Sequence, residues 1–585
     1  MDRKSIIVIA ACLGTLVLWV TVVIPKFTPP PKPVAPGSTN APVLAEASPT
    51  SPAPRSAATN TPKSVIAANA LEALLEVTNE NSHYTFTSHG GGLKLVELVN
   101  YPETVAKKKD RPPTSRGATL NTQTPVPTLA VVDGEALQGD GIFALTRTAT
   151  GVRAEKTLAG GLTIIKEFTL STNYLLGATV RLENHSAEPL VLPEQKWVVG
   201  TATPMSLQDN GQAVGVMWYD GDKKQDVSGA YFDNKTLGCF PGTPLSEYRR
   251  GQSNVVWAAI HNQFFTLAAM PLEPAGEVLV HKVSLPKPSA EEIAATPGVN
   301  REPAGFTATL LYPAVTIPPN QAVQHQFSLF AGPKEYQTLA RIADRFSNKV
   351  DLVMNFGFFG FFAKALLLVM NWFHDVLRLS YGWAIILCTV LIKLIFWPLT
   401  AASTRSMKRM QALQPQMAAI KEKYKDDPLK MNKKTMEFMK ENKVSPLGGC
   451  LPMALQMPIF FGFYTMIQSA IELRGASWFW VADLSKPDTL CMIPGTHFPF
   501  NLLPLIMGGT MFWQAQLAPP SPGVDPAQQK IMKYMPLMFL VILYNFSAGL
   551  ALYWTVSNLL TILQTKLTKT EPVVAVLKPA PKKGK

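Results

Sequence analysis

The sequence has few charged residues, few cysteines and none of the short motifs that bind metals or phosphates. Charged residues make up 16% of the 585-residue chain, against roughly 25% in a typical soluble protein. The five cysteines form no CxxC pair, the eight histidines form no HExxH motif, and no glycine-rich phosphate loop occurs. We therefore expect no metal site and no metalloenzyme. We also expect no cofactor, no small-molecule substrate and no enzymatic activity. The low charge predicts very apolar segments joined to a soluble part.

The amino-terminal residues 1–24 are predicted to form a transmembrane anchor. Ser5–Ile24 is almost continuously apolar and is long enough to cross a hydrocarbon core of about 30 Å. A cleaved signal peptide is the alternative. However, only a few apolar residues precede Cys12, and the apolar sequence continues beyond it through Trp19, whereas polar sequence would follow a cleavage site. Residues 25–64, rich in Pro, Ala, Ser and Thr, bury too little apolar surface to fold and read as a tether.

Residues 65–345 are predicted to form a soluble β-sandwich domain. Short segments of alternating polarity recur at Tyr84–Thr87, Leu162–Phe168 and Leu176–Leu182. Turn signals such as Gly90–Gly92 and Asp209–Gly211 separate the segments. Many short strands over such a length favour a large sandwich. The sequence alone does not tell which of its carboxylates and histidines converge in space.

A different composition begins near residue 356, where we predict an interfacial helix over 356–381. The stretch Phe358–Leu379 is apolar and aromatic, yet its polar residues lie seven, four and three positions apart and so share one helix face: Lys364, Asn371, Asp375 and Arg378. An amphipathic helix of this kind lies in the membrane interface.

Residues 382–567 are predicted to form a core of five membrane spans. The apolar segments are Trp383–Leu399, Leu447–Ile471, Phe498–Leu517, Met532–Phe546 and Gly549–Leu567. The loop 401–444 between the first two carries eleven basic and five acidic residues, which places it in the cytoplasm. With the loop 401–444 and the start of the anchor both in the cytoplasm, the segment 356–381 cannot cross the membrane. The β domain then lies outside, and both chain ends lie in the cytoplasm. The tail 568–585 is lysine-rich and read as a basic cytoplasmic segment.

The loop 401–444 is predicted to be a helical hairpin. An apolar stripe at helical spacing runs through Met407, Met410, Leu413, Met417 and Ile420. Asp427 followed by Pro428 is a good start for the second helix. A methionine-rich stripe is most often internal packing. The alternative is adaptable contact with apolar partners, for which Met407, Met410 and Met417 are our candidates.

Lys393 is the most informative single residue, because it lies about ten residues inside a predicted span. A lysine at depth costs roughly 2.5–3.5 kcal/mol on insertion scales and so faces water or a partner. Snorkelling to the cytoplasmic headgroups is the alternative. The neighbouring spans offer no acidic partner, whereas Thr389 one turn earlier and Gln456 in the next span add polarity.

Several motifs in this part of the chain resemble one known family. They are Trp397–Thr400, Asn442–Pro452, Gln456–Phe460, Asp525-Pro526, Met535-Pro536, Ser547–Trp554 and Ser557-Asn558. Together, from about residue 356 to 567, they closely resemble the YidC/Oxa-type membrane protein insertases. The anchor, tether and large outer domain look like the Gram-negative form, with a weaker likeness at Gly91-Gly92, Asn184 and Gly332-Pro333.

The resemblance implies a fold and a mechanism. It implies an α-helical polytopic membrane bundle, joined to a periplasmic β-sandwich that is similar to sugar-mutarotase folds and lacks catalysis. Nascent inner-membrane proteins would be inserted, and helped to fold, through a hydrophilic groove, alone or with the Sec translocon. Lys393, Thr389, Gln456, Phe460 and Tyr553 would line the groove. The family usually has Arg where this chain has Lys393. The positive charge is therefore kept, but the two parallel N–H donors with which a guanidinium binds a carboxylate are lost.

The same resemblance implies further partners. The hairpin and the basic tail would contact the ribosome, whose phosphates suit lysine, the Sec translocon, or an inserting chain, and the bundle would contact membrane lipids. A secondary transporter that uses an intramembrane lysine is the alternative function. That class usually shows inverted repeats, and we find no repeat. An anchored carbohydrate enzyme would need one span only, and a purely structural scaffold would not need Lys393.

Overall fold

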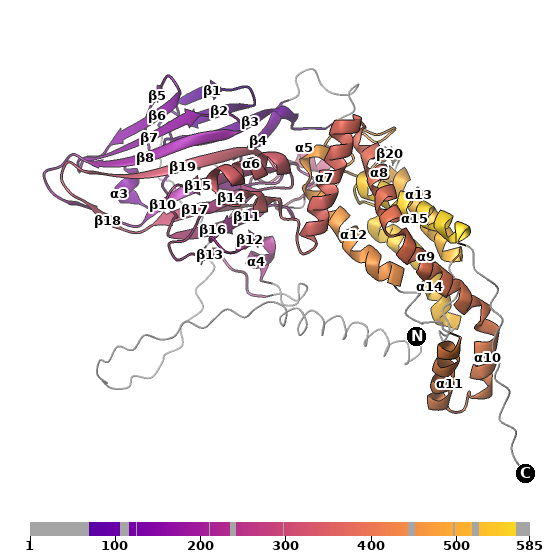
Figure 1. The fold of residues 1–585 in the computed structure, drawn as a ribbon. Coiled ribbons are helices and arrows are strands. Elements are labelled where there is room, and N and C mark those ends of the chain that lie inside the picture. The colour runs from indigo at the N-terminus through magenta and orange to yellow at the C-terminus, as the bar shows by residue number, and fades with distance from the viewer. Residues whose placement is uncertain are drawn as a thin grey trace, which may run out of the picture. The chain divides into compact units, whose positions relative to one another are not determined.

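The computed structural model describes residues 70–105, 116–123, 126–209, 211–234, 242–295, 298–442, 451–494, 498–517 and 526–568. These residues form a β domain followed by a helical region (Figure 1). The predicted anchor 1–24, the tether 25–64 and nearly all of the tail 568–585 lie outside the described residues.

The largest element of the β domain is an antiparallel nine-stranded sheet, ordered β12-β11-β14-β15-β19-β8-β7-β6-β5 (Figure 1). Its strands are β5 (Ala144–Arg147), β6 (Gly151–Thr157), β7 (Leu162–Leu170), β8 (Leu175–Asn184), β11 (Gly215–Tyr219), β12 (Lys224–Ser228), β14 (Trp257–His261), β15 (Phe265–Pro271) and β19 (Ala322–Pro333). The pairing of β19 with β8, from Ala322↔Glu183 to Phe330↔Leu175, joins the late strands to the early ones. The predicted strands at Tyr84–Thr87, Leu162–Phe168 and Leu176–Leu182 are confirmed.

Smaller antiparallel sheets complete the β domain. One is ordered β10-β17-β16-β13, formed by β10 (Gln195–Ala202), β13 (Glu247–Arg250), β16 (Glu277–Ser284) and β17 (Ala304–Tyr312). Another consists of β1 (Leu74–Thr78), β2 (Ser82–Thr87), β3 (Gly92–Pro102) and β4 (Gly117–Leu120), and a third pairs β9 (Leu190–Leu192) with β18 (Val315–Ile317). Short helices α3 (Glu135–Gln138), α4 (Gly229–Asp233) and α5 (Ala290–Ala295) lie in the connections.

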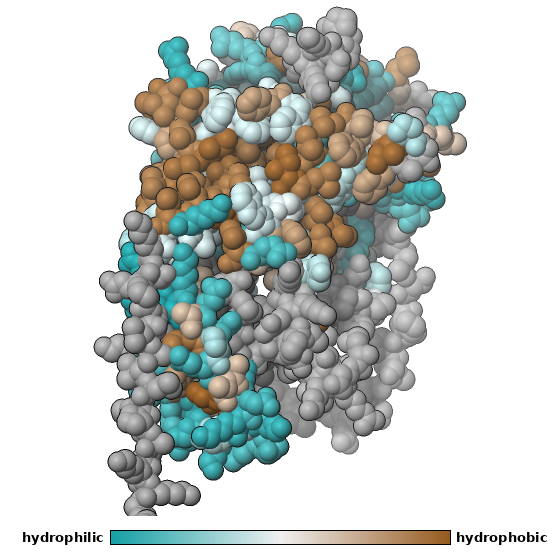
Figure 2. Space-filling view, turned by 90° about the vertical axis from the view of Figure 1, so that its right-hand side faces the viewer, coloured by the Kyte–Doolittle hydropathy of each residue, from teal (hydrophilic) through white to brown (hydrophobic). Residues whose placement is uncertain are grey.

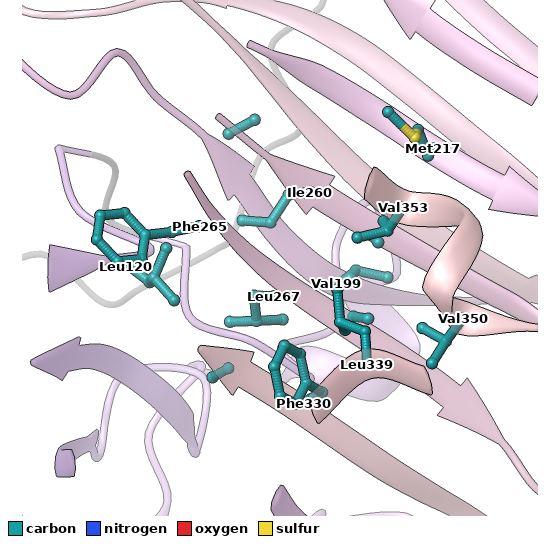
Figure 3. Close-up of a cluster of buried hydrophobic side chains, with 14 of the residues drawn as sticks. Leu120, Val199, Met217, Ile260, Phe265, Leu267, Phe330, Leu339, Val350 and Val353 are labelled. Carbon is teal, nitrogen blue, oxygen red and sulfur yellow. The ribbon is translucent and has the colours of Figure 1, made fainter. Parts of the chain in front are cut away.

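The core of the β domain lies where these layers meet, since β10 packs on β14 and β15, and β17 packs on β14. Figure 3 shows part of it, with Ile260, Leu267 and Phe330 from the nine-stranded sheet close to Val199 of β10. Two short helices after the last strand, α6 (Tyr336–Phe346) and η2 (Val350–Met354), add Leu339, Val350 and Val353 to the same cluster (Figure 3). Burial of apolar side chains from facing layers is what holds a sandwich together.

One lysine occupies a core position of this domain. On β7, residues alternate so that Ile164, Lys166 and Phe168 face inward, and Lys166 is fully buried. Its ammonium donates to the carbonyls of Gly90 and Leu129, both at 2.7 Å, and lies 4.4 Å from the centre of the Phe143 ring. Burial, with a smaller effect of nearby Lys156, lowers the pKa of Lys166 to about 7. Lys166 thus joins a sheet to the glycine turn at residues 90–92.

The interfacial segment predicted at 356–381 contains helix α7 (Gly360–Leu377). Its predicted polar face is not uniformly exposed, because Asn371 is buried and donates at 3.2 Å to Glu472. Glu472 belongs to the short helix η4 (Ile471–Leu473). Glycine allows the close packing of α7 on α12 (Leu451–Ser469), since a Cβ at Gly462 would lie 2.8 Å from the Phe362 Cβ atom.

The remaining helices form the helical region. They are α8 (Tyr381–Ile395), α9 (Trp397–Ala412), α10 (Gln414–Lys423), α11 (Pro428–Glu441), α12, α13 (Leu502–Leu517), α14 (Pro526–Leu543) and α15 (Ala548–Leu567). Helix α15 packs on α8, α12 and α13. Residues Phe498–Asn501, predicted to start a span, form strand β21 paired with β20 (Thr489–Ile493). Figure 2 shows a broad apolar band on one face, with hydrophilic residues gathered below it.

By length and composition, α7 is the one described helix that could cross a membrane unaided, and α8 with α9 qualifies as a second, bent candidate. The bend of 65° falls at Phe396. The predicted span Trp383–Leu399 contains this bend, and its boundary at Leu399 stays a prediction. Pro398 lies in the first turn of α9; it has no amide proton and its ring crowds the preceding turn, which favours a bend at this point. The arrangement of five spans stays a prediction.

The hairpin consists of α9, α10 and α11, and α10 and α11 lie side by side (Figure 1). The first arm is not one helix as predicted, because it breaks at Leu413 just before Pro415. Asp427 is the N-cap of α11, as predicted, and its carboxylate accepts from the Lys430 amide at 3.0 Å.

Candidate functional site

Lys393 lies in the last turn of α8, directly before the bend at Phe396. Its ammonium donates to the Thr561 hydroxyl on α15 at 2.9 Å and lies at 3.5 Å from the Gln456 amide oxygen on α12. Three helices distant in sequence therefore meet at this side chain. The ammonium contacts side chains of α12 and α15. A lysine that snorkelled along its own helix toward the headgroups would not make these contacts.

A polar cluster surrounds the lysine, and we define it as Lys393, Gln456, Tyr553, Ser557 and Thr561. The Gln456 amide nitrogen donates to the Tyr553 hydroxyl and lies 3.4 Å from the Ser557 hydroxyl. Tyr553 is 2% exposed and its ring stacks on Phe463 with centroids 4.1 Å apart. The hydrogen-bonded amide and the packed ring fix the acceptors around the ammonium.

The polar cluster carries a positive charge that nothing in it neutralises. All of the acceptors that contact Lys393 are uncharged oxygens. Among the residues that the structure describes, the ion pairs do not include Lys393. A half-buried ammonium with neutral partners keeps its full attraction for an anion, and this attraction is stronger than in water because the surroundings are apolar.

The structure brings together only some of the residues that the sequence suggested. Lys393, Gln456 and Tyr553 meet in the polar cluster. Thr389 is 1% exposed, and its hydroxyl donates to the Ile385 carbonyl of its own helix at 2.7 Å. Phe460 is half-buried and packs against Trp554, with ring centroids 4.7 Å apart. Phe460 thus contacts the same helix as the cluster, α15, through an aromatic pair.

Thr561 and Ser557 were not among the predicted site residues. The sequence does hold a signal for them, because Tyr553, Ser557 and Thr561 recur every four residues in an apolar helix. That spacing places all three on one face. Reading the period of the polar residues, in addition to that of the apolar ones, would have identified this face.

The methionines proposed for the hairpin occupy two kinds of position. Met410 and Met417 are buried, at 7% and 2% exposure, in a small core with Leu413, Phe438 and Met439. Met407 is half-exposed. Met410 and Met417 therefore serve internal packing of the hairpin. Of the three methionines, Met407 is the one whose side chain is accessible to a partner.

The β domain brings one histidine close to a carboxylate in its interior. His261 Nε2 lies 3.9 Å from Asp226 Oδ1, and Lys334 donates to the Asn262 carbonyl next to it. Burial, together with the charge of Lys334, lowers the pKa of His261 to about 3. An imidazole with that pKa is a poor base at neutral pH, so this pair is unsuited to acid–base catalysis.

An apolar helical region with a cation that no described carboxylate neutralises, joined to a β domain, fits the class of membrane proteins. Comparison with known proteins supports this class. Residues 372–573 match the family described as 60Kd inner membrane protein, and residues 74–369 match the YidC periplasmic domain. The membrane protein insertase YidC of Syntrophus aciditrophicus is 32% identical over 588 residues, which cover 96% of this chain and 98% of that protein.

The chain therefore belongs to the YidC family of membrane protein insertases. It is an inner-membrane protein with a periplasmic domain, and nascent membrane proteins are its clients. The transporter alternative receives no support from these relatives.

Two solved structures align with the chain at low TM-scores. One is a crystal structure of active YidC insertase with the first transmembrane domain resolved, at 18% identity, TM-score 0.33, and coverage of 87% of this chain and 95% of that chain. The other is a galactose mutarotase related enzyme from Lactobacillus acidophilus, at 12% identity, TM-score 0.27, and coverage of 44% of this chain and 97% of that chain. At these TM-scores neither likeness adds to the argument.

Proposed function

We propose that the polar cluster is the point at which this insertase receives the polar segment of an incoming membrane protein. The observation that carries the proposal is the ammonium of Lys393, held by neutral acceptors and paired with no described carboxylate. A short acidic segment of a client supplies the missing charge, and its attraction to Lys393 draws it out of water. Thr389, Gln456, Phe460 and Tyr553 line this path.

The driving force in this scheme is burial of the client's apolar helix in lipid. Each buried Leu or Val side chain contributes roughly 1.5–3 kcal/mol, so a new span supplies ample free energy. The cost lies in moving the polar segment across the apolar barrier. A hydrophilic groove lined by the polar cluster lowers that cost, so the scheme needs no nucleotide hydrolysis.

We further propose the topology that the sequence predicts. The anchor 1–24 and a five-span core over 382–567 cross the inner membrane, 356–381 lies in the interface, and both chain ends are cytoplasmic. The hairpin 401–444 is then cytoplasmic, with Met407, Lys-rich α11 and the tail 568–585 available to the ribosome, the Sec translocon or an inserting chain. The excess of basic residues in 401–444 supports this orientation.

Reconstitution tests the role of the charge. The purified full-length protein is placed in liposomes with a single-span client that carries an acidic outer segment, and insertion is followed by protease protection of that segment. We expect Lys393→Arg to retain insertion, because the charge is kept. Lys393→Glu should abolish most of it through repulsion.

Two controls sharpen the test. A client with a neutral outer segment should be less sensitive to Lys393→Glu than the acidic one. Insertion by Lys393→Glu at the wild-type rate, or failure of Lys393→Arg, would overturn the proposed role of the charge. Insertion no better than into protein-free liposomes would show that the protein does not act alone, and the same variants would then be measured with the Sec translocon present.

A further inference from the structure

The base of the cytoplasmic hairpin is joined to the end of α15 by contacts that the proposed mechanism does not use. Lys408 on α9 donates to the backbone carbonyls of Thr565 at 2.8 Å and Thr568 at 2.7 Å. Gln564 on α15 donates to the Trp397 carbonyl at 3.2 Å and to the Thr400 hydroxyl at 2.6 Å. The side chains thus reach in opposite directions, one from each helix.

Lys408 satisfies groups that α15 itself leaves without partners. The last four carbonyls of an α-helix have no amide donor within the helix, and Thr565 is among them in α15. A cation at a helix C-terminus is also attracted by the helix dipole. Because both of its acceptors are backbone atoms, Lys408 recognises the end of α15 whatever side chains stand there.

Gln564 supplies the second point of attachment. Its side chain is 3% exposed and contacts the first turn of α9, directly after the 65° bend at Phe396. From Thr400 to Lys408 is eight residues, about 12 Å along a helix. One contact would let α9 pivot at the bend, whereas two contacts at this separation fix its direction.

We propose that Lys408 and Gln564 are positioning residues that form a latch, which holds α9 along the end of α15 and so keeps the hairpin in place beside the polar cluster during insertion. The purpose of the latch rests on the proposed function: α8 carries Lys393 and continues directly into α9, so the direction of α9 sets where the hairpin lies relative to Lys393. The bend leaves the hairpin without a continuous helix to support it, and the latch replaces that support.

Distance measurements test the latch without relying on activity. Nitroxide labels are placed at exposed positions on the hairpin and on α15, Ala419→Cys and Leu559→Cys, in the full-length protein with its native cysteines replaced. We expect one narrow distance distribution for the wild type and for Lys408→Arg, which keeps donors and charge. Lys408→Met and Gln564→Leu should each broaden it.

Insertion of the acidic client is measured on the same variants without labels. Lys408→Met loses both hydrogen bonds to the end of α15 and should slow the initial rate by at least about tenfold, the factor that corresponds to one charge-assisted hydrogen bond. Arg405→Met is the matched control, because it removes an equal charge from an exposed position on the same helix, α9. It should insert at close to the wild-type rate, and Lys408→Arg should restore the rate.

The outcomes separate the latch from the function it serves. An unchanged distance distribution in Lys408→Met and Gln564→Leu would overturn the latch. Equal slowing by Arg405→Met would also overturn it, because the effect would then belong to the charge of α9 and not to the contact with α15. If Lys408→Met proves unstable, Gln564→Leu tests the same contact from the other helix. A wild type that inserts the client neither alone nor with the Sec translocon would overturn the proposed function, while the label distances would still decide whether the latch exists.

Discussion

Lys393 and Thr561 are 168 residues apart in the sequence, yet the ammonium and the hydroxyl are 2.9 Å apart. The threonine hydroxyl also donates to the Ser557 carbonyl at 2.8 Å, which orients its oxygen. An acceptor held in this way stabilises the ammonium without neutralising it. This relationship makes the cation of the insertase both fixed and unpaired.

We expect Thr561→Val to weaken insertion of a client with an acidic segment. The substitution keeps the shape of the side chain and removes the acceptor, and a hydrogen bond of this kind contributes about 1 kcal/mol, or roughly a fivefold change in rate. Initial insertion rates in liposomes measure the effect. Thr565→Val is the control, because that hydroxyl only donates to the Thr561 carbonyl of its own helix.

The same pair provides a double-mutant cycle. In a Lys393→Met background, Thr561→Val should have almost no further effect on the rate, because the lysine that it serves is gone. Additive losses would mean that Thr561 acts independently of Lys393.

Lys166 should make the stability of the periplasmic domain depend on pH. Its pKa is about 7 in the folded protein, below the ordinary value of 10.5. Between these pH values the unfolded chain binds a proton that the folded chain does not, so stability rises with pH, by at most about 1.4 kcal/mol per pH unit. Below pH 7 both states are protonated and the penalty for burial is complete.

The pH effect is isolated by comparing the wild type with Lys166→Met. The difference in free energy of unfolding, followed by tryptophan fluorescence of the full-length protein, should shift in favour of the wild type from pH 7 to pH 10. Lys282→Met, at a half-exposed position paired with Asp233, is the control. Its difference in free energy of unfolding from the wild type should change much less with pH. A flat difference for Lys166→Met would mean that the buried amine does not lose its proton in this range.

Gly462 should resist even the addition of one methyl group. A Cβ there would lie 2.8 Å from the Phe362 Cβ and 3.3 Å from the Ala363 backbone nitrogen, so α7 and α12 would have to move apart. We expect Gly462→Ala to cost about 1–3 kcal/mol, measured as a lower unfolding temperature in detergent. At Gly509 on α13 nothing lies within 4 Å, and Gly509→Ala should change stability by no more than about 1 kcal/mol.

The hairpin should unfold when its own core is charged. Met417 is 2% exposed within an apolar cluster, so Met417→Asp would bury a carboxylate among apolar side chains and should cost about 3 kcal/mol or more. Limited proteolysis between residues 401 and 441 measures the loss of structure. Met436→Asp, at 59% exposure on α11, should leave the protease pattern unchanged. Equal cleavage of both variants would show that the small core does not hold the hairpin together.

The sequence by itself determined the division into a β domain and apolar helices, several of the strands and the hairpin, and it made Lys393 the leading candidate for the site. These features depend on local periodicity, on turn residues such as Gly90–Gly92 and on the cost of a charge in an apolar helix. Nearby residues carry all of that information. The resemblance at residues 356–567 added the insertase family, which the relatives then confirmed.

Other features were decided only by the tertiary structure. The sheet order that pairs β19 with β8, the burial of Lys166 beneath a distant glycine turn, and the position of Thr561 next to Lys393 each join residues far apart in the chain. The break at Phe396 and the contacts of Lys408 with the end of α15 belong to the same group. Periodicity tells which face of a helix or strand is apolar or polar, but only packing decides which other element that face meets.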